Sequence, residues 1–174
     1  MTYLCRNLAM QLYQIRSKQI LPISKKEAWD FLSNPSNLKV ITPEHMGFHI
    51  LDGAEQPMFP GQIIQYKVRP FPFLEMKWVT EITHVETEHY FVDEQRFGPY
   101  ALWHHKHFIK EVEGGVEMQD IVDYKLPFGI LGRLAHPLLV KKQLQSIFTF
   151  REQRLTEVFG TVEGAENMLE IKAI

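Results

Sequence analysis

A long amphipathic segment near the C-terminus, residues 138–159, constrains the fold more than any other feature of the sequence. Its apolar residues recur at steps of three and four, so they form one stripe along a helix, while the charged residues lie mostly away from that stripe. The stripe contains Val140, Leu144, Ile147, Phe148, Leu155, Val158 and Phe159. Such a helix is about 33 Å long, so it needs a broad apolar surface to pack against.

The rest of the chain supplies that surface, because most of it alternates between apolar and polar residues as strands do. Strands are predicted over residues 12–20, 48–51, 62–69, 74–86, 90–97, 100–112 and 116–126, with Gly or Pro turn signals between most of them. Two short helices follow the first strand. Ser24 and Glu27 form a capping box for one, and Asn34 with Pro35 begins the other. Pro137 predicts a bend just before the long helix.

This order of elements predicts an α+β fold in which a curved antiparallel sheet of about seven strands wraps around the C-terminal helix. Strong twist in such a sheet leaves space between its concave face and the helix, which is where a ligand would bind. We expect one domain over residues 10–159, with an N-terminal extension at 1–9 and a loosely ordered tail at 160–174. The tail ends in an apolar run, 168–174, that can dock on the domain.

Composition narrows the class of protein. The formal net charge is −2 over 174 residues, which does not favour binding to nucleic acid. Cys5 is the only cysteine, so an intramolecular disulfide and a zinc finger are both excluded. The N-terminus lacks the apolar core of a signal peptide, and nowhere do about 18 apolar residues follow one another. We therefore expect a cytoplasmic protein without a transmembrane segment; nothing in the sequence predicts its oligomeric state.

Two turn signals allow the last three strands to be aligned. If Gly98-Pro99 and Gly114-Gly115 are two-residue turns, alternate residues of the three strands share one apolar, inward face. With two residues of earlier strands, this face contains Tyr66, Trp78, Tyr90, Val92, Glu94, Trp103, His105, His107, Asp120, Val122 and Tyr124. The remaining residues, among them Phe91 and Asp93, form a face that is predicted to be solvated.

The inward face is unusual because aromatic and aliphatic residues surround Glu94, His105, His107 and Asp120. Burying such groups without partners is costly, so they must pair with one another, with water or with a bound molecule. The two histidines point the same way, as in some metal sites, and either Asp120 or Glu94 could be a third ligand. The aromatic neighbours suit an organic ligand better than a hydrated ion. A purely structural hydrogen-bond network is the remaining alternative.

Asp120, beside Tyr124 and the two histidines, also suits general acid–base chemistry, as a base or as the group that orients an imidazole. The same carboxylate can instead be a paired structural acid. Arg151 lies in the apolar stripe of the long helix. It either pairs with Glu94, Asp120 or an anionic ligand, or it packs its stem on the core and extends its guanidinium into solvent. No nucleophile or cofactor motif accompanies these residues, so we expect no cofactor and no metal.

Several short runs, in this order along the chain, carry a resemblance to a known superfamily. They are Asn34-Pro35 with Asn37-Leu38 and Thr42-Pro43, Phe91-Val92-Asp93 with Gln95, Gly98-Pro99-Tyr100 with Trp103, His105 and His107, and Asp120 with Tyr124, Leu126-Pro127 and Gly129. Over residues 10–159 the chain resembles a bacterial branch of START-like proteins, also called SRPBCC or helix-grip proteins, which include polyketide cyclase/dehydratases and lipid-transfer domains. The resemblance implies a hydrophobic-ligand cavity between sheet and helix, without naming the ligand.

The sequence therefore predicts a protein that binds a small hydrophobic or amphipathic molecule of aromatic, lipid-like or polyketide-like character. The predicted ligand-binding residues are Tyr66, Trp78, Tyr90, Val92, Glu94, Trp103, His105, His107, Asp120, Val122, Tyr124 and Arg151. One alternative is a cyclase/dehydratase-type enzyme in which His105 or His107 is the acid or base and Asp120 orients it. Another is a regulatory or partner-binding module without a ligand. The apolar run at 127–139 can cover the cavity, touch a membrane transiently or simply pack as the start of a helix.

Overall fold

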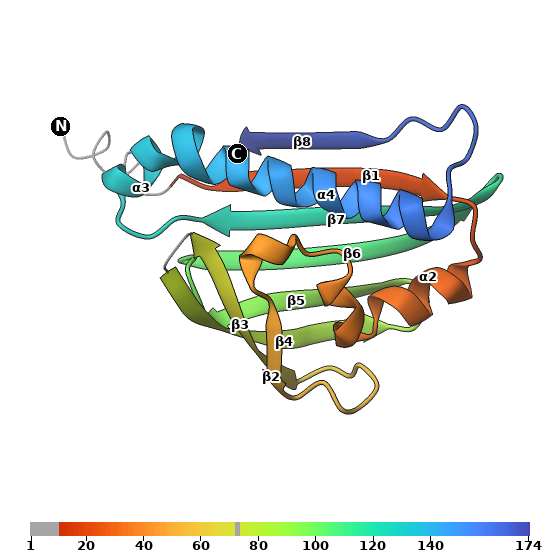
Figure 1. The fold of residues 1–174 in the computed structure, drawn as a ribbon, viewed down its shortest axis with the longest axis horizontal. Coiled ribbons are helices and arrows are strands. Elements are labelled where there is room, and N and C mark those ends of the chain that lie inside the picture. The colour runs from red at the N-terminus through yellow and green to blue at the C-terminus, as the bar shows by residue number, and fades with distance from the viewer. Residues whose placement is uncertain (1–10, 72–73) are drawn as a thin grey trace.

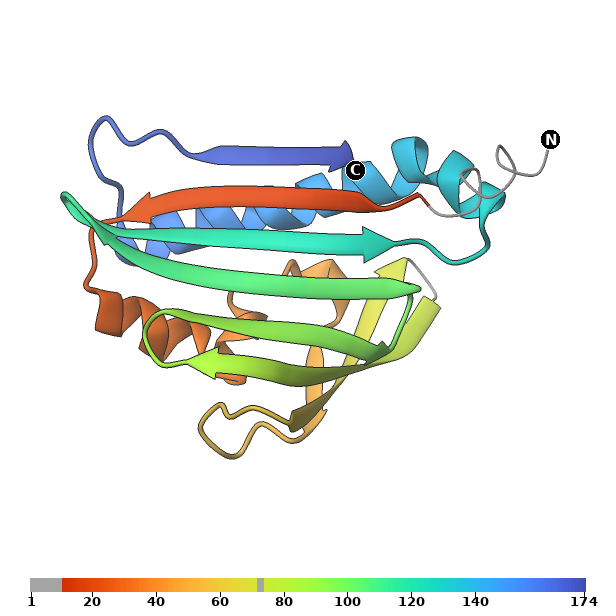
Figure 2. The ribbon, with the colours of Figure 1, turned by 180° about the vertical axis from the view of Figure 1, so that it is seen from behind.

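The computed structural model describes residues 11–71 and 74–174, so the N-terminal extension predicted at 1–9 lies outside the described residues. One antiparallel sheet of eight strands dominates the structure, in the order β2-β3-β4-β5-β6-β7-β1-β8 (Figures 1 and 2). The strands are β1 (Tyr13–Leu21), β2 (His49–Asp52), β3 (Gln62–Phe71), β4 (Leu74–Glu86), β5 (Tyr90–Phe97), β6 (Leu102–Val112), β7 (Gly115–Lys125) and β8 (Met168–Ala173). Strands β2 to β7 follow one another as neighbours, and β1 returns to pair with β7.

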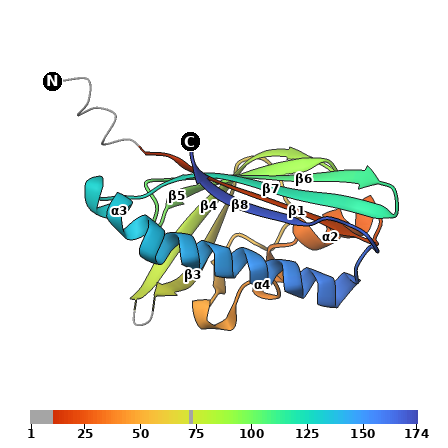
Figure 3. The same cartoon turned by 90° about the horizontal axis from the view of Figure 1, so that it is seen from above.

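Short helices connect β1 to β2, as the capping residues predict. Helix α2 (Lys25–Leu32) begins with the capping box of Ser24 and Glu27, and the 3-10 helix η1 (Pro35–Lys39) is capped by the side chain of Asn34. A further 3-10 turn, η2 (Glu44–Met46), precedes β2. These helices lie on the same side of the sheet as the long C-terminal helix (Figure 3).

The C-terminal helix is interrupted at Pro137, where the sequence predicts a bend. Helix α3 (Ile130–Ala135) leads into a π-helical turn, η3 (His136–Val140), which contains the proline and continues as α4 (Lys141–Phe159). Proline lacks the amide hydrogen of a regular helix, so a local change of hydrogen-bond spacing is expected there. The buried row of α4 is Leu144, Phe148, Arg151 and Leu155. Val158, predicted to continue that row, is exposed in the last turn.

Helix α4 packs on only one half of the sheet. A large apolar cluster joins Val140, Leu144 and Phe148 to residues of β1, β6, β7 and β8. A separate cluster on β3 and β4, built from Ile64, Tyr66, Val68 and Ile82, contains no residue of α4. The two halves of the concave face are therefore separated by space that the helix does not fill. This is the α+β arrangement that the order of elements predicts and the helix-grip fold that the resemblance implies.

The segment predicted as a loosely ordered tail contains an eighth strand. Strand β8 pairs antiparallel with β1, with Ile171 opposite Ile15, and Ile171 is buried in the cluster under α4. The expectation of a loose tail is wrong for these residues. The apolar residues of β8 alternate as in a strand. Their pairing partner, β1, lies about 150 positions earlier in the chain, and a local pattern does not reveal so distant a neighbour.

The predicted register of the last three strands is corrected in two ways. Between β6 and β7, His107 lies opposite Asp120 rather than Val122, a shift of two residues that keeps every side chain on its predicted face. Between β5 and β6, Asp93 lies opposite His105. The predicted register would place Glu94 opposite Trp103, so here the shift is one residue, and each β5 side chain is on the opposite face from that predicted.

The turns explain both shifts. Gly115 is the first residue of β7 and pairs with Val112, so the tight turn is Glu113-Gly114. A Cβ on Gly115 would lie 2.0 Å from the carbonyl oxygen of Leu21, so this glycine is needed for close approach of β1 and not for the turn. Before β6, the side chain of Gln95 accepts from the backbone nitrogen of Tyr100 and donates to its carbonyl, which makes a wide loop in place of a two-residue turn.

None of the helices in the part of the chain that the structure describes is long and apolar enough to cross a lipid bilayer.

Replacing Ile171 with alanine tests whether β8 is an integral part of the fold. Because Ile171 is 7% exposed and packs in the cluster under α4, we expect its truncation to lower the free energy of unfolding by about 2–4 kcal/mol. The matched control is Ile174→Ala, since Ile174 is 55% exposed at the end of the same segment and should change stability little. Urea denaturation followed by tryptophan fluorescence measures both; equal effects would contradict the packing of β8.

Candidate functional site

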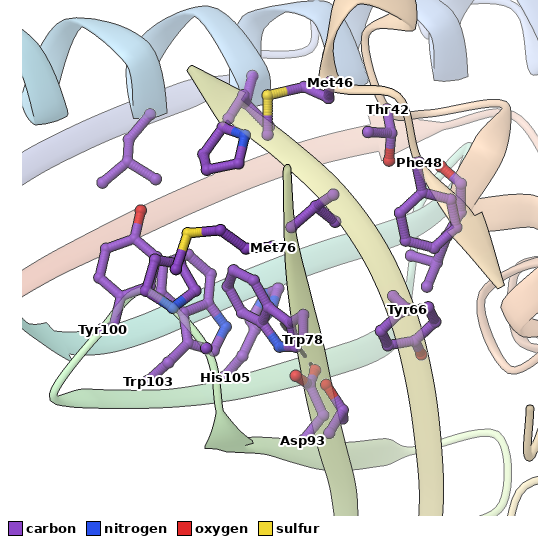
Figure 4. Close-up of a pocket in the computed structure, with 18 of the residues that line it drawn as sticks. Thr42, Met46, Phe48, Tyr66, Met76, Trp78, Asp93, Tyr100, Trp103 and His105 are labelled. Atoms are coloured by element: carbon purple, nitrogen blue, oxygen red, sulfur yellow. Dashed lines mark hydrogen bonds and ion pairs between the residues drawn. The ribbon is translucent and has the colours of Figure 1, made fainter. Parts of the chain in front are cut away.

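A cavity of about 670 Å³ occupies the space between the concave sheet and α4. Its walls come from β3, β4, β5 and β6, from α4, and from the short helices before β2 (Figure 4). It extends to the surface beside α3, because Phe128 and Leu139 line it and are 82% and 58% exposed. The cavity therefore has an opening at that end and a closed interior over the sheet.

Most of the wall is apolar and aromatic. The inward residues of β3 and β4 face each other in pairs, Tyr66 with Trp78 and Val68 with Met76. The rings of Trp78, Tyr100 and Trp103 cluster on one wall, with centroids 4.7–5.8 Å apart (Figure 4). From the helix side, Leu144, Ile147 and Phe148 complete the lining. Such a surface favours a molecule with a flat or extended apolar body.

One end of the cavity is polar and buried. His105 and His107 project to the same side of β6, Asp93 comes from β5 and Arg151 from α4, and all four line the cavity. Asp120 of β7 lies behind them, opposite His107 in the register. His105, His107, Asp120 and Arg151 are each at most 9% exposed. Four elements therefore bring five ionisable side chains together where water has little access.

The two histidines lie between the two carboxylates. His105 places Nε2 3.1 Å from Asp120 Oδ1 and Nδ1 3.5 Å from Asp93 Oδ1. His107 places Nε2 2.8 Å from Asp93 Oδ1 and Nδ1 2.9 Å from Asp120 Oδ1. The imidazole centroids are 3.7 Å apart. Arg151 Nη2 lies 3.3 Å from the same Asp120 oxygen. We refer to Asp93, His105, His107, Asp120 and Arg151 as the polar cluster.

Burial and charge pairing shift the pKa values of the two carboxyl groups in opposite directions. Burial alone would raise the pKa of Asp120, but Arg151 and the two histidines hold that pKa well below its usual range. Burial would likewise raise the pKa of Asp93, yet His105, His107 and Arg151 lower it. Both carboxyls are therefore ionised, and they need positive partners to remain so in this environment.

The histidines share the remaining positive charge unequally. Burial lowers the pKa of both imidazoles, but the nearby carboxylates of Asp120 and Asp93 outweigh burial for His107, whose pKa is raised. For His105, burial and the neighbouring His107 charge prevail over the two carboxylates, and the pKa is lowered. Asp93 and Asp120 together carry two negative charges, which Arg151 and one protonated imidazole balance. This balance lowers the cost of holding two carboxylates in the interior.

The structure brings together about half of the residues predicted for the site. Tyr66, Trp78, Trp103, His105, His107 and Arg151 line the cavity. Asp120 contacts both histidines from behind, while Val122 and Tyr124 are fully buried in the core under α4. The alternative in which Arg151 extends into solvent is wrong, because its side chain is buried against Asp120.

Three predicted residues lie on the other face of the sheet as a consequence of the β5 register. Glu94 forms an ion pair with Arg96 at 3.2 Å, Tyr90 packs on Phe108, and Val92 pairs with Lys106. None of these three lines the cavity. Phe91 and Asp93 take the places predicted for Val92 and Glu94. The sequence offered a weak signal for them, because either alternate set of β5 contains an aromatic residue and an acid.

Comparisons with known proteins identify the fold. No family model matches the sequence, and no curated protein matches it closely enough to be a relative. Among solved structures, CV1439 from Chromobacterium violaceum aligns with a TM-score of 0.64 at 11% identity, over 86% of this chain and 99% of that one. Ms6760 from Mycobacterium smegmatis aligns with a TM-score of 0.59 at 16% identity, over 83% and 92%.

A third similar structure is Ara h 8.0201, a Bet v 1-like helix-grip protein, with a TM-score of 0.53 at 13% identity over 84% of this chain and 99% of that one. Identities this low show a shared fold and nothing finer. The helix-grip architecture predicted from the sequence is confirmed, and the function must be argued from the cavity.

Replacing Arg151 with methionine tests the charge balance of the polar cluster. The variant leaves Asp120 buried without its guanidinium partner, so we expect a loss of about 3–5 kcal/mol in the free energy of unfolding. Adding Asp120→Asn should restore part of that loss, because the unpaired charge is then gone. The control is Arg154→Met, one turn along on the exposed side of α4, where loss of the pair with Glu157 should cost less than about 1 kcal/mol. Similar losses in both single variants would contradict the pairing.

Proposed function

We propose that this protein binds a small hydrophobic or amphipathic molecule in the cavity between the sheet and α4. The observation that carries the proposal is an apolar cavity of about 670 Å³ with a single buried polar end. That volume lies within the range of about 300–1,000 Å³ that is typical of small-molecule sites. Without a ligand, the side chains that line a cavity of this size would lack van der Waals contacts on one side, which lowers stability.

The shape and chemistry of the walls describe the ligand class. The ring cluster of Trp78, Tyr100 and Trp103 suits an aromatic or polycyclic body by stacking and edge contacts. Because the charged groups of the polar cluster already pair with one another, this end of the cavity suits a neutral hydroxyl or carbonyl group better than a further full charge. The ligand class is therefore an apolar, aromatic or polyketide-like body with one neutral oxygen at the end that reaches Asp93 and His105.

A second candidate function uses the same groups. Since His105 lines the cavity and its Nε2 lies 3.1 Å from Asp120, the pair has the geometry of an imidazole oriented by a carboxylate, as acid–base catalysis of a cyclase/dehydratase type requires. Recovery of an added polyketide-like compound in cyclised form, or with the loss of one water, would favour this enzyme, whereas recovery of the compound unchanged favours a carrier.

Binding can be located with the protein's own tryptophans. The chain has three, of which Trp78 and Trp103 line the cavity and Trp29 does not. N-phenyl-1-naphthylamine, a neutral aromatic probe that absorbs tryptophan emission, should bind saturably and quench that emission by energy transfer. We expect Trp78→Phe and Trp103→Phe each to weaken probe binding several-fold, because they remove wall contacts, and Trp29→Phe to change the affinity little.

This titration can contradict the proposal in two ways. A probe affinity in Trp78→Phe and Trp103→Phe equal to that of Trp29→Phe would place the probe outside the cavity. A lack of saturable binding for this probe and for long-chain alcohols would mean that the cavity does not accept apolar molecules.

The opening of the cavity suggests how such a ligand enters. Six large apolar side chains around α3 and η3 are between 58% and 82% exposed: Phe128, Ile130, Leu131, Leu134, Leu138 and Leu139. Between Asp123 and Glu152 the chain has no acidic residue, and its basic residues apart from the buried Arg151 are Lys125, Arg133, Lys141 and Lys142. An exposed apolar surface with basic neighbours complements an anionic lipid surface. We call these six exposed residues the rim. We infer that the rim touches such a membrane and that apolar ligands pass between membrane and cavity there.

Replacing two apolar residues of the rim with glutamate tests this membrane contact. Leu134→Glu combined with Leu138→Glu should lower co-sedimentation with phosphatidylglycerol-containing vesicles several-fold, because both side chains are exposed and would oppose the anionic surface. The control is Ile63→Glu, an exposed apolar residue on β3 that should leave vesicle binding unchanged. Equal binding of the wild type to pure phosphatidylcholine would contradict the role of the basic residues. An absence of vesicle binding would contradict the membrane contact while leaving ligand binding in solution unaffected.

A further inference from the structure

Three potential metal ligands converge at the polar end of the cavity. One nitrogen of His105, one nitrogen of His107 and a carboxylate oxygen of Asp93 all lie within 4.8 Å of one another. His107 Nε2 is 2.8 Å and His105 Nδ1 is 3.5 Å from Asp93 Oδ1. We propose that these three residues bind a divalent transition-metal ion, Zn²⁺ or Fe²⁺, which the sequence alone does not lead one to expect.

The spacing of the donor atoms fits a single ion. Zinc binds nitrogen and carboxylate oxygen at about 2.0–2.2 Å, so neighbouring donors in its coordination sphere lie about 3–3.5 Å apart. The two measured nitrogen–oxygen separations, 2.8 and 3.5 Å, bracket that range. All three donor atoms lie within 4.8 Å of one another, so side-chain rotation can bring them around one centre. Two imidazoles and one carboxylate form a donor set that suits zinc and non-haem iron.

Asp120 lies where its carboxylate can orient the rings of both histidines. Its Oδ1 lies 3.1 Å from His105 Nε2 and 2.9 Å from His107 Nδ1, which are the ring nitrogens that do not face Asp93. Metal-binding histidines characteristically donate their second N–H to a carboxylate, which fixes the tautomer and the ring orientation. Here one carboxylate can orient both rings, and Arg151 in turn holds that carboxylate at 3.3 Å.

His107 carries a separate sign that its present contacts are incomplete. Its Nδ1 is buried and lacks a hydrogen bond although Asp120 Oδ1 is 2.9 Å away, because the two groups are not aligned. A buried polar atom without a hydrogen bond costs about 1–3 kcal/mol. A change in the orientation of the His107 ring on binding an ion beside Asp93 would give this Nδ1 nitrogen the chance to donate to Asp120.

The cavity leaves room for a further ligand on the metal ion. Three protein ligands leave at least one coordination position open, as in sites that bind a water or a ligand atom. Because Asp93, His105 and His107 line the cavity, that position faces the space in which we place the organic molecule. A hydroxyl or carbonyl oxygen of the ligand is the natural occupant. The metal site itself does not depend on organic-ligand binding, and it is tested without an organic ligand.

The test uses Co²⁺ as a spectroscopic substitute for zinc. Full-length protein is freed of metal with a chelator, titrated with Co²⁺ at neutral pH, and then titrated with Zn²⁺ by calorimetry. We expect one equivalent of Co²⁺ to bind, with visible absorption bands that Zn²⁺ abolishes. His107→Ala and Asp93→Asn should each weaken binding by more than about 10-fold, and Asp120→Asn by about 10-fold or more through loss of orientation.

The matched control is His104→Ala. His104 neighbours His105 on β6 but lies on the opposite face, where it is 3.9 Å from Glu94, so its loss should leave metal affinity unchanged. Circular dichroism and urea unfolding establish that each variant is folded; if His107→Ala is not, His107→Gln takes its place. Failure of the wild type to retain an equivalent of either metal would overturn the proposal, as would equal affinity in the site variants and in His104→Ala. Neither result would bear on probe binding by the apolar walls, which Trp78 and Trp103 report separately.

Discussion

Two carboxylates in the interior, the buried Asp120 and the largely covered Asp93, impose the constraint on which the rest of this structure depends. Neither can be ionised in an apolar interior unless positive groups lie within a few ångströms. Those groups come from β6 and from α4, so compensating the charges fixes where the helix crosses the sheet and which face of β6 points inward. Arg151 is the only charged member of the buried row of α4, and its pairing with Asp120 aligns the helix in a way that interchangeable leucine contacts do not.

The cavity follows from how that helix is held. Leu144 and Phe148 pack against β1, β6, β7 and β8, while β3 and β4 form an apolar cluster of their own. A twisted sheet of eight strands does not present both halves to one straight helix, and Trp78 packs against the clusters of both halves. The space is therefore a consequence of sheet twist and helix placement, with the polar cluster at the boundary between the two halves.

Much of this arrangement can be predicted from the sequence, and the failures have local causes. The 3.6-residue stripe predicts α4, turn residues predict the ends of most strands, and β6 and β7 face as expected although their register shifts by two. The register of β5 fails because the Gln95 side chain bonds to the Tyr100 backbone and widens the loop, an interaction that turn composition does not reveal. Asp93 and Glu94 are neighbours of the same chemistry, so only the true register tells which one meets the histidines. Strand β8 fails because its partner is remote in sequence.

The charge balance of the polar cluster differs between two states, one with a proton on His107 and one with a bound metal ion. Asp93 and Asp120 carry two negative charges and Arg151 one positive charge, so the cluster lacks one positive charge. A proton on His107 supplies that charge and leaves a neutral, hydrogen-bonding surface at the end of the cavity. A divalent ion between Asp93, His105 and His107 supplies one charge more, and the surplus attracts a ligand oxygen with partial or full negative charge. The same five residues would thus recognise a neutral hydroxyl in one state and a more polarised oxygen in the other, while the aromatic walls bind the same apolar body in both.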